Sequence, residues 1–317
     1  APYSVHLLEK ELWPFPSHLP LTDYRPLHYF LFPRSPAQCY TYALCNFQQG
    51  NFMTARERVL LTLARQAADR VPINYDANDD IDRRLKNHFG LASHDHIGLR
   101  DALGIDFCCI HAPFVGCSPH VDIPERGVKV DPWGIHRRWV EHPSGGYWDY
   151  CDFPLKEADE EQVAAWPLPS PDDFDYSHVA ADCRRLRRFA LWVGGAGVGD
   201  VINQGGMLRG MEQTLVDMVT ADPAGMLLAK RRVDIQVEWV RRTIEAAQGE
   251  IDFVWMGEDL GTQIGPMISL DTYRQVLRPI HQRIVDMAKS FGLPVMIHSC
   301  GSSSWAYEDF IEMGIDA

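Results

Sequence analysis

A histidine and a cysteine separated by one residue are the side chains of this sequence best suited to bind a metal. His298-Ser299-Cys300 follows the apolar run 293–297 and precedes Gly301. In a β-strand, residues two apart project to the same face, so the imidazole and the thiol can bind one ion. Nitrogen and sulfur donors favour zinc, which takes about four ligands and keeps one exchangeable position in catalytic sites. We therefore expect His298 and Cys300 to be zinc ligands; the alternative is that both are simply packed or hydrogen-bonded.

A second polar cluster ends the preceding apolar run. It reads Gly257-Glu258-Asp259-Leu260-Gly261-Thr262-Gln263. Adjacent side chains of a strand point in opposite directions, so one carboxylate can face the site while the other braces the loop. We expect Glu258 to face the site, where it would complete the metal shell, orient His298 or act as a general acid or base. Glu258 and Asp259 are therefore the catalytic candidates, and a solvated acidic loop is the alternative.

Other polar residues follow the expected strands. Asp76 comes after the first strand and Asn203-Gln204 after the third, and Gln263 belongs to the cluster just described. We take Asp76, Asn203, Gln204 and Gln263 as candidates for binding a substrate. The glycines between 194 and 199 do not match the dinucleotide-binding fingerprint, and we expect them to allow close backbone packing.

Short apolar runs alternate with amphipathic helices along the chain, which is the pattern of parallel strands joined by crossover helices. The expected strands are residues 71–77, 106–114, 190–202, 252–259 and 294–300. Gly249 and Gly292 mark the ends of two long helices, whereas Asp222-Pro223 and Pro279 mark helix starts. In a barrel of parallel strands the carboxyl ends of the strands form the active site, and both polar clusters fall at such ends.

Residues 127–176 interrupt this alternation. Short strands at 128–133, 137–141 and 147–153 are expected around a Ser144-Gly145-Gly146 turn, followed by a proline-rich stretch. We interpret this segment as a β-hairpin insertion over one mouth of an α/β fold, a TIM-type (β/α)8 barrel that spans residues 53–317. Five strands are visible, so a barrel of eight would need about three more after Ala317. We expect the barrel to be incomplete at its C-terminus.

The first 52 residues differ from the rest of the chain. They contain seven of the 21 prolines and three acidic residues, and they show no sustained helical or alternating period. Immediately afterwards, Thr54 and Glu57 have the spacing of a helix capping box. We expect residues 1–52 to be an extension outside the barrel and the natural protein to start at Met53.

The overall composition excludes several classes of partner. With 30 basic and 43 acidic residues the formal net charge is -13, which disfavours nucleic acid and acidic membrane surfaces as ligands. No apolar run approaches the roughly 18 residues needed to cross a bilayer. The eight cysteines are irregularly spaced and no signal peptide is visible, so we expect a cytoplasmic protein.

Taken together, four segments resemble the uroporphyrinogen decarboxylase superfamily. They are residues 53–73, Asp131-Pro132-Trp133-Gly134, 257–272 and 295–301. The most specific blocks are Gly257 to Gln263 and His298-Ser299-Cys300-Gly301, in the order and at the spacing of that superfamily. The resemblance covers about residues 53–317 and implies a TIM-type barrel.

The resemblance implies one of two activities. Tetrapyrrole decarboxylases carry an Arg-Gln-Ala-Gly-Arg-Tyr stretch after the first strand, where this chain has the acidic loop 74–80. Like charges disfavour a substrate with many carboxylates. The other branch consists of zinc methyltransferases that work with corrinoid proteins, in which the histidine and cysteine bind zinc together with a cysteine that would lie after Ala317.

We therefore expect a zinc-dependent methyltransferase that moves a methyl group between the corrinoid of a partner protein and a thiol, a folate or a methoxylated small molecule. Zinc would either lower the pKa of a bound thiol or polarise a methoxy oxygen. Two alternatives remain: a decarboxylase acting on a substrate other than uroporphyrinogen, and a non-catalytic module that binds a corrinoid partner.

Overall fold

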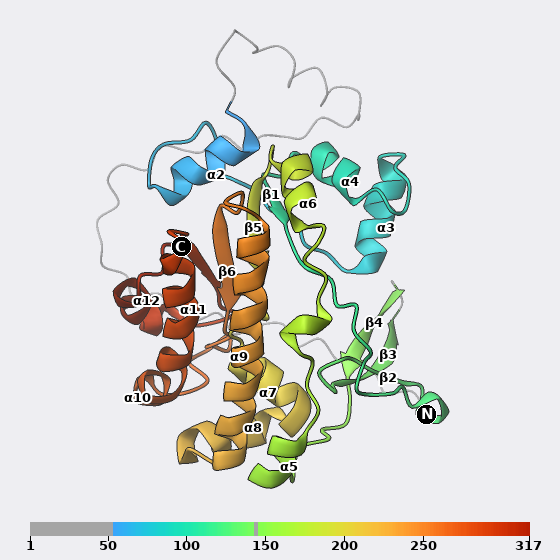
Figure 1. The fold of residues 1–317 in the computed structure, drawn as a ribbon, viewed down its shortest axis with the longest axis vertical. Coiled ribbons are helices and arrows are strands. Elements are labelled where there is room, and N and C mark those ends of the chain that lie inside the picture. The colour runs from blue at the N-terminus through green and yellow to red at the C-terminus, as the bar shows by residue number, and fades with distance from the viewer. Residues whose placement is uncertain (1–52, 143–144) are drawn as a thin grey trace, which may run out of the picture. The chain divides into compact units, whose positions relative to one another are not determined.

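The computed structural model describes residues 53–142 and 145–317, and these form an α/β fold around a parallel sheet (Figure 1). The strands pair in the order β1-β5-β6-β7, with all neighbours parallel. Their bounds are β1 (Phe107–Cys109), β5 (Ala190–Gly194), β6 (Phe253–Gly257) and β7 (Val295–His298). The prediction of an α/β fold with a parallel sheet is thus confirmed, and within the described residues this sheet is open with four strands. The expectations for residues 1–52 lie outside the described part.

Helices connect the strands and cover the sheet. They are α2 (Ala55–Leu63), α3 (Asp79–His88), α4 (His96–Leu103), α5 (Glu160–Ala165), α6 (Val179–Leu186), α7 (Val201–Arg209), α8 (Met211–Thr220), α9 (Pro223–Ala246), α10 (Leu270–Thr272), α11 (Arg278–Ser290) and α12 (Tyr307–Met313). Short helical turns lie at η1 (Pro124–Arg126), η2 (Pro171–Asp173), η3 (Tyr273–Leu277) and η4 (Ser304–Ala306). The long helices α9 and α11 pack against each other and over the same face of the sheet (Figure 1).

Local sequence signals set most helix ends. Thr54 and Glu57 form the predicted capping box at the start of α2. Asp222 caps α9, which begins at Pro223 as expected. Pro279 does not start a helix as expected, because the helical segment that contains it already begins at Leu270. A π-helical turn, η3, precedes Pro279, whose missing N–H cannot donate to the preceding turn of an α-helix.

Three strand predictions are wrong in whole or in part. The strand expected over 106–114 is only β1, which ends at Cys109. Residues 71–77 form no strand; Val71 is 78% exposed, and Pro72 has no N–H to offer a neighbour. The strand expected over 190–202 ends at Gly194, and α7 already begins at Val201. Gly194, the last residue of β5, and Gly195 after it adopt positive φ angles of 103° and 136°, so the chain leaves the strand direction here.

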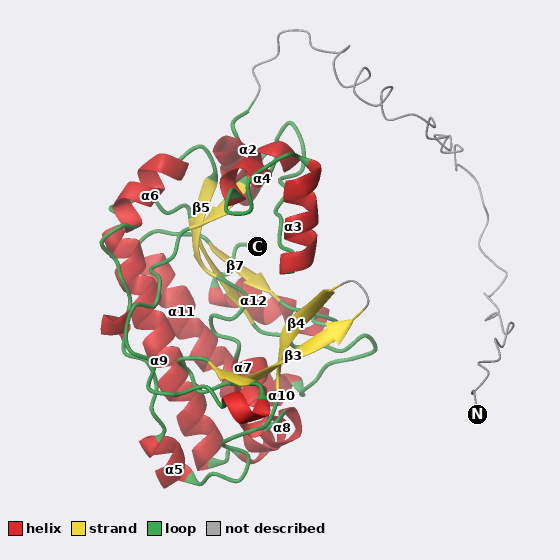
Figure 2. Cartoon of the chain, turned by 90° about the vertical axis from the view of Figure 1, so that its right-hand side faces the viewer, coloured by secondary structure: helices red, strands yellow, loops and turns green. Residues whose placement is uncertain are grey.

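The insertion contains a three-stranded antiparallel sheet, shown as a layer separate from the parallel strands in Figure 2. Its strands are β2 (Val128–Val130), β3 (His136–His142) and β4 (Gly145–Tyr150), in the order β2-β3-β4. The predicted hairpin between 137 and 153 is therefore confirmed. Gly145 and Gly146, however, belong to β4 and not to the turn, since Gly145 pairs with His142.

Both faces of the parallel sheet carry apolar side chains. Leu191, Val254 and Val295 lie in the main core, to which α9 and α11 also contribute. The opposite face carries Trp192 and Trp255, whose ring centroids are 4.6 Å apart, and it packs around a smaller core with Val59 of α2, Ala190 and Phe253. A sheet that is apolar on both faces is typical of parallel α/β folds.

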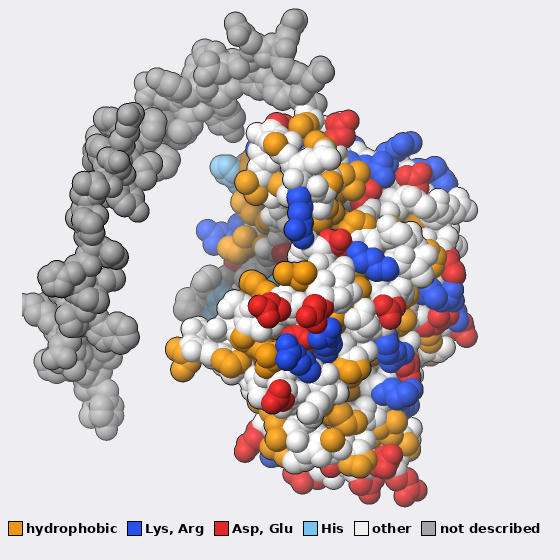
Figure 3. All heavy atoms as spheres, turned by 90° about the vertical axis from the view of Figure 1, so that its left-hand side faces the viewer, with side chains coloured by type: hydrophobic (Ala, Val, Ile, Leu, Met, Phe, Trp, Pro, Cys, Tyr) orange, Lys and Arg blue, Asp and Glu red, His pale blue; other side chains and the backbone are white. Residues whose placement is uncertain are grey.

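The surface of the described chain mixes both charges. Figure 3 shows acidic and basic side chains next to one another on one face, and ion pairs such as Arg283–Asp234 at 2.5 Å occur on exposed positions. Such pairs contribute little to stability individually. No helix in residues 53–142 or 145–317 combines the length and apolar character that crossing a membrane requires.

Buried ion pairs fix the amino-terminal ends of the strands. Asp106, directly before β1, is fully buried; its carboxylate lies 2.5 Å from Arg58 of α2 and 2.6 Å from Arg70, and it accepts the N–H of Ile73 at 2.8 Å. Asp252, directly before β6, pairs with Arg56 of α2 at 2.8 Å. These contacts attach α2 to the sheet.

Asp106→Ala should lower the free energy of unfolding by about 3 kcal/mol or more, because it leaves Arg58 with less compensation for its buried charge. Asp101→Ala is the matched control: Asp101 is exposed and pairs with Arg188, so its loss should cost less than about 1 kcal/mol. Urea unfolding measures both changes. Equal effects of the two substitutions would contradict this account.

Candidate metal centre

Asp259, His298 and Cys300 lie together at the carboxyl ends of β6 and β7. One potential ligand atom from each lies within 4.8 Å of the others. Among the described residues, these three are the His, Cys, Asp or Glu side chains that lie close enough together to hold one metal ion. His298 Nε2 is 3.2 Å from Cys300 Sγ and 3.4 Å from Asp259 Oδ1. His298 and Cys300 thus approach each other as predicted.

Strand pairing brings these residues together. β6 and β7 are parallel neighbours, and Gly257, the last residue of β6, is the register partner of His298. The next residue continues the contact, because Glu258 N–H donates to the carbonyl of His298 at 2.9 Å. Asp259 Oδ1 accepts the backbone N–H of Cys300 at 2.7 Å. The carboxylate of Asp259 is therefore held by the backbone of Cys300 itself.

Two glycines allow the loops that follow β6 and β7 to touch. A Cβ atom on Gly261 would lie 2.2 Å from the backbone nitrogen of Ser302, and one on Gly301 would lie 2.2 Å from the carbonyl oxygen of Gly261. Gly301 also has a φ of +70°. No larger residue fits at either position without moving the backbone. The loops are thus packed closely on either side of the cluster.

Glu258 and Asp259 point in opposite directions as expected, but their roles are exchanged. Glu258 is 0% exposed and faces the start of α7, where its carboxyl group accepts the N–H groups of Val201 at 2.8 Å and Ile202 at 3.0 Å. Asp259 is the carboxylate beside His298. The expectation that Glu258 faces the metal position is therefore wrong. Hydrogen bonds to a helix N-terminus stabilise a carboxyl group that has lost its water.

His281 of α11 completes the surroundings of Glu258. Its Nε2 lies 3.2 Å from both the carbonyl of Gly199 and Glu258 Oε2. Because a carbonyl can only accept, Nε2 must carry a hydrogen. Burial lowers the pKa of His281 to about 4, and its Nδ1 has no hydrogen-bond partner within the described residues. The imidazole is thus neutral at pH 7.

Asn203 links the buried carboxyl groups to the cluster. Its Nδ2 donates to Asp200 Oδ2 and to Asp259 Oδ2, both at 3.0 Å. Burial raises the pKa of Glu258 to about 8, and burial together with the charge of Glu258 raises that of Asp200 to about 8. Asn203, predicted to bind substrate, therefore holds Asp259 in place in this structure.

The pKa of Asp259 is shifted in the opposite direction from the pKa values of the buried residues Glu258 and Asp200. Partial burial alone would raise the pKa of Asp259, but hydrogen bonds from Cys300 N–H and Asn203 outweigh it and the net pKa is lowered. The pKa of the Cys300 thiol is raised, first by partial burial and then by Asp259. Cys300 is exposed and His298 half-buried, so the cluster is open to solvent on one side.

The other predicted substrate-binding residues lie elsewhere. Gln204 accepts a hydrogen bond from Arg232 and lines a cavity that none of the three metal-ligand candidates lines. Asp76 is exposed in the segment before α3, and Gln263 is exposed in the loop after β6. Among the described residues, no hydrogen bond joins Asp76 or Gln263 to the metal-binding cluster.

Sequence reasoning missed three polar residues near the sites. His281 lies only two positions after Pro279, and nothing local indicates its contact with Glu258. Asp200 had a detectable signal, since an aspartate directly before an apolar helix is a typical N-cap, and it accepts Asn203 N–H at 3.0 Å. The spacing of Arg232 was also a signal, because it belongs to a row of residues four positions apart that is buried on α9: Leu228, Arg232, Gln236 and Val240.

Comparison with known proteins adds no assignment to a family. No protein-family model matches the sequence, and no curated protein matches it. The resemblance stated above therefore remains a prediction, and the functional argument depends on the geometry of the site.

The exchanged roles of the two acidic residues predict different effects of their removal. Glu258→Ala should lower the free energy of unfolding by at least about 3 kcal/mol, because it leaves buried N–H donors of α7 without an acceptor. Asp259→Ala should change stability by less but weaken metal binding. Urea unfolding and zinc titration separate the two effects. A Glu258→Ala protein of unchanged stability would contradict the assignment.

Proposed function

We propose that this chain is a zinc-dependent methyltransferase that exchanges a methyl group with the corrinoid of a partner protein. The observation that carries the proposal is the cluster of His298, Cys300 and Asp259, with one ligand atom from each lying within 4.8 Å of the others. The resemblance to the uroporphyrinogen decarboxylase superfamily, and to its zinc methyltransferases in particular, supports the same activity.

The donor set suits zinc. Imidazole nitrogen, thiolate sulfur and carboxylate oxygen are all common zinc ligands, and three protein ligands leave one position for a reactant. Asp259 provides a third donor from within the described residues, where the family resemblance implies a cysteine after Ala317. When bound, zinc would supply a Lewis acid that activates a thiol or polarises a methoxy oxygen. Asn203 and Cys300 N–H would hold the carboxylate of Asp259 during this chemistry.

The surrounding fold is compatible with this function. We propose that the parallel sheet is part of a (β/α)8 barrel, because its strands are sequential parallel neighbours and apolar on both faces. The exposed position of Cys300 would allow a large corrinoid to approach from a partner.

The described cysteines are free thiols, which supports a reducing compartment such as the cytoplasm.

Zinc added to the metal-free 317-residue chain should bind with one ion per chain. His298→Ala and Cys300→Ser should each weaken binding by more than the roughly 10- to 100-fold that loss of an outer partner costs. Cys117→Ser, which removes another exposed thiol, should bind zinc as the unaltered chain does. Competition with a chromogenic chelator measures the affinities. Equal affinity of all three variants would exclude this site.

The zinc-loaded chain should transfer a methyl group from methylcobalamin to 2-mercaptoethanol. The carbon–cobalt bond breaks, the electron pair stays on cobalt as Co(I), the methyl forms a bond to sulfur, and the thiol proton passes to solvent. His298→Ala should slow this reaction at least about 100-fold, because Lewis-acid stabilisation is worth several kcal/mol. Visible absorption of the corrinoid follows it, with Cys117→Ser as control. An unchanged rate in His298→Ala would refute the zinc mechanism.

A further inference from the structure

A pocket beside the edge strand β1 lies apart from the metal-binding candidates. Its volume is about 390 Å³, and it is lined by residues 96, 97 and 100 of α4, 108–111 at and after the end of β1, and 182, 185 and 186 of α6. β1 and β7 are the two edges of the four-stranded sheet, so three strand spacings, or about 14 Å, separate them. A pocket of this size is at the lower end of those that bind small organic molecules.

A buried lysine fixes the hydrogen-bonding state of His96, which lines this pocket. Lys86 of α3 is 1% exposed, and its ammonium group lies 2.6 Å from Asp82 Oδ2 and 2.9 Å from the carbonyl oxygen of Ser93. The same group lies 2.8 Å from His96 Nδ1. Because an ammonium group can only donate, Nδ1 must accept and the ring hydrogen lies on Nε2. Nε2–H has no hydrogen-bond partner within the described residues, so it is a donor available to a ligand.

Arg100 adds a positive charge that no described carboxylate neutralises. It lies four residues after His96, so both side chains project from the same side of α4. Its Nη1 donates to the carbonyl of Phe107 at 3.1 Å, and among the described residues it forms no ion pair. Arg185, the second arginine of the pocket, is paired with Asp182 at 2.7 Å. The lining therefore carries one uncompensated positive charge.

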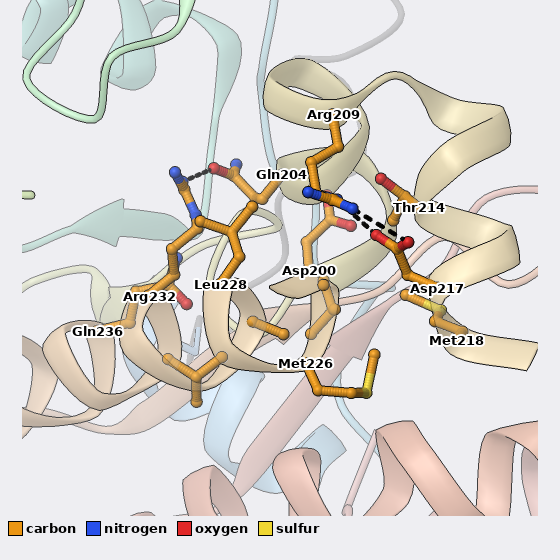
Figure 4. Close-up of a pocket in the computed structure, with 15 residues that line it drawn as sticks. Asp200, Gln204, Arg209, Thr214, Asp217, Met218, Met226, Leu228, Arg232 and Gln236 are labelled. Carbon is orange, nitrogen blue, oxygen red and sulfur yellow. Dashed lines mark hydrogen bonds and ion pairs between the residues drawn. The ribbon is translucent and has the colours of Figure 1, made fainter. Parts of the chain in front are cut away.

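A smaller pocket between α7, α8 and α9, shown in Figure 4, lacks this combination. Its volume is about 20 Å³, which holds about one water molecule. Arg209 is paired there with Asp217 at 2.5 Å, and Arg232 donates to Gln204. An uncompensated charge and space for an organic ligand coincide at Arg100 but not in this pocket.

Most of the remaining wall beside β1 is apolar. Ile97, Ile110 and Leu186 line it together with Cys108 and Cys109. Burial raises the pKa of Cys109 to about 12 and also raises that of Cys108, so both thiols are uncharged at neutral pH. Such walls favour the apolar part of an organic ligand over a hydrated inorganic ion.

We propose that this pocket binds a small organic anion. Its carboxylate or phosphate group is held by the guanidinium group of Arg100 and by Nε2–H of His96, and its apolar part lies against Ile97, Ile110 and Leu186. Charge-assisted hydrogen bonds from a guanidinium group suit either oxyanion. This site does not depend on the proposed function, because none of the metal-binding candidates lines the pocket.

The test is a titration of the metal-free chain with butyrate and with butyl phosphate, followed by ligand-detected NMR. Removing metal prevents the anions from binding to an ion at the cluster. At least one of the two anions should bind roughly 10- to 100-fold more tightly than 1-butanol, the neutral analogue. Tighter binding of butyrate would identify a carboxylate ligand, and tighter binding of butyl phosphate a phosphate ester. If neither anion binds more tightly than butanol, the proposal is overturned, and this comparison needs no variant.

Matched substitutions of arginine locate the site. Arg100→Gln should weaken binding of the preferred anion roughly 10- to 100-fold. Arg184→Gln is the control, because Arg184 is exposed on α6 and does not line the pocket; it should leave the affinity unchanged. An equal loss in both variants would mean that general charge, and not this pocket, attracts the anion.

Two substitutions of His96 test its part in the site. In His96→Gln the amide oxygen can accept from Lys86 while the amide N–H still donates to the ligand, so binding should largely be kept. His96→Leu removes the donor and should weaken binding roughly 10-fold. Equal affinities of the two variants would show that His96 does not hold the anion.

Discussion

The buried carboxyl group of Glu258 is the constraint on which the arrangement of the site depends. It accepts hydrogen bonds from the first turn of α7 and lies within hydrogen-bond distance of His281 of α11, so it ties the end of β6 to two helices. Because side chains alternate along an extended chain, fixing Glu258 on one side sends Asp259 to the other. Asp259 then meets His298 and Cys300 at the carboxyl end of β7. The grouping of the three candidate ligands is thus a consequence of how Glu258, the neighbour of Asp259, is buried.

The two ends of the sheet are held by different kinds of polar interaction. At the amino-terminal ends, Asp106 and Asp252 are paired with arginines, and these contacts attach α2 to the sheet. At the carboxyl ends, Glu258 and Asp200 have raised pKa values and hydrogen-bond mainly to amide groups. The side chains of Asp259, His298 and Cys300, by contrast, remain at least partly accessible at this end of the sheet.

Much of this arrangement is predictable from short stretches of sequence, because caps, strand ends and the spacing of His298 and Cys300 are local features. The failures have physical causes. Residues 71–77 have the composition of a strand but include a proline and no partner strand forms along them. Alternation shows that Glu258 and Asp259 diverge, but not which one is buried. That choice is made by His281 and α7, which are distant in sequence and approach only in the folded chain.

The three candidate ligands lie within a single strand–helix–strand unit, which gives metal binding a second effect. Asp259 and Cys300 are 41 positions apart, and an ion bound to both would close the intervening chain into a ring. In the unfolded state such a ring has fewer conformations than the open chain, and the entropy lost grows slowly with its length. The ion would therefore act as a removable cross-link around α11, and a chelator that removes it would also loosen this part of the protein.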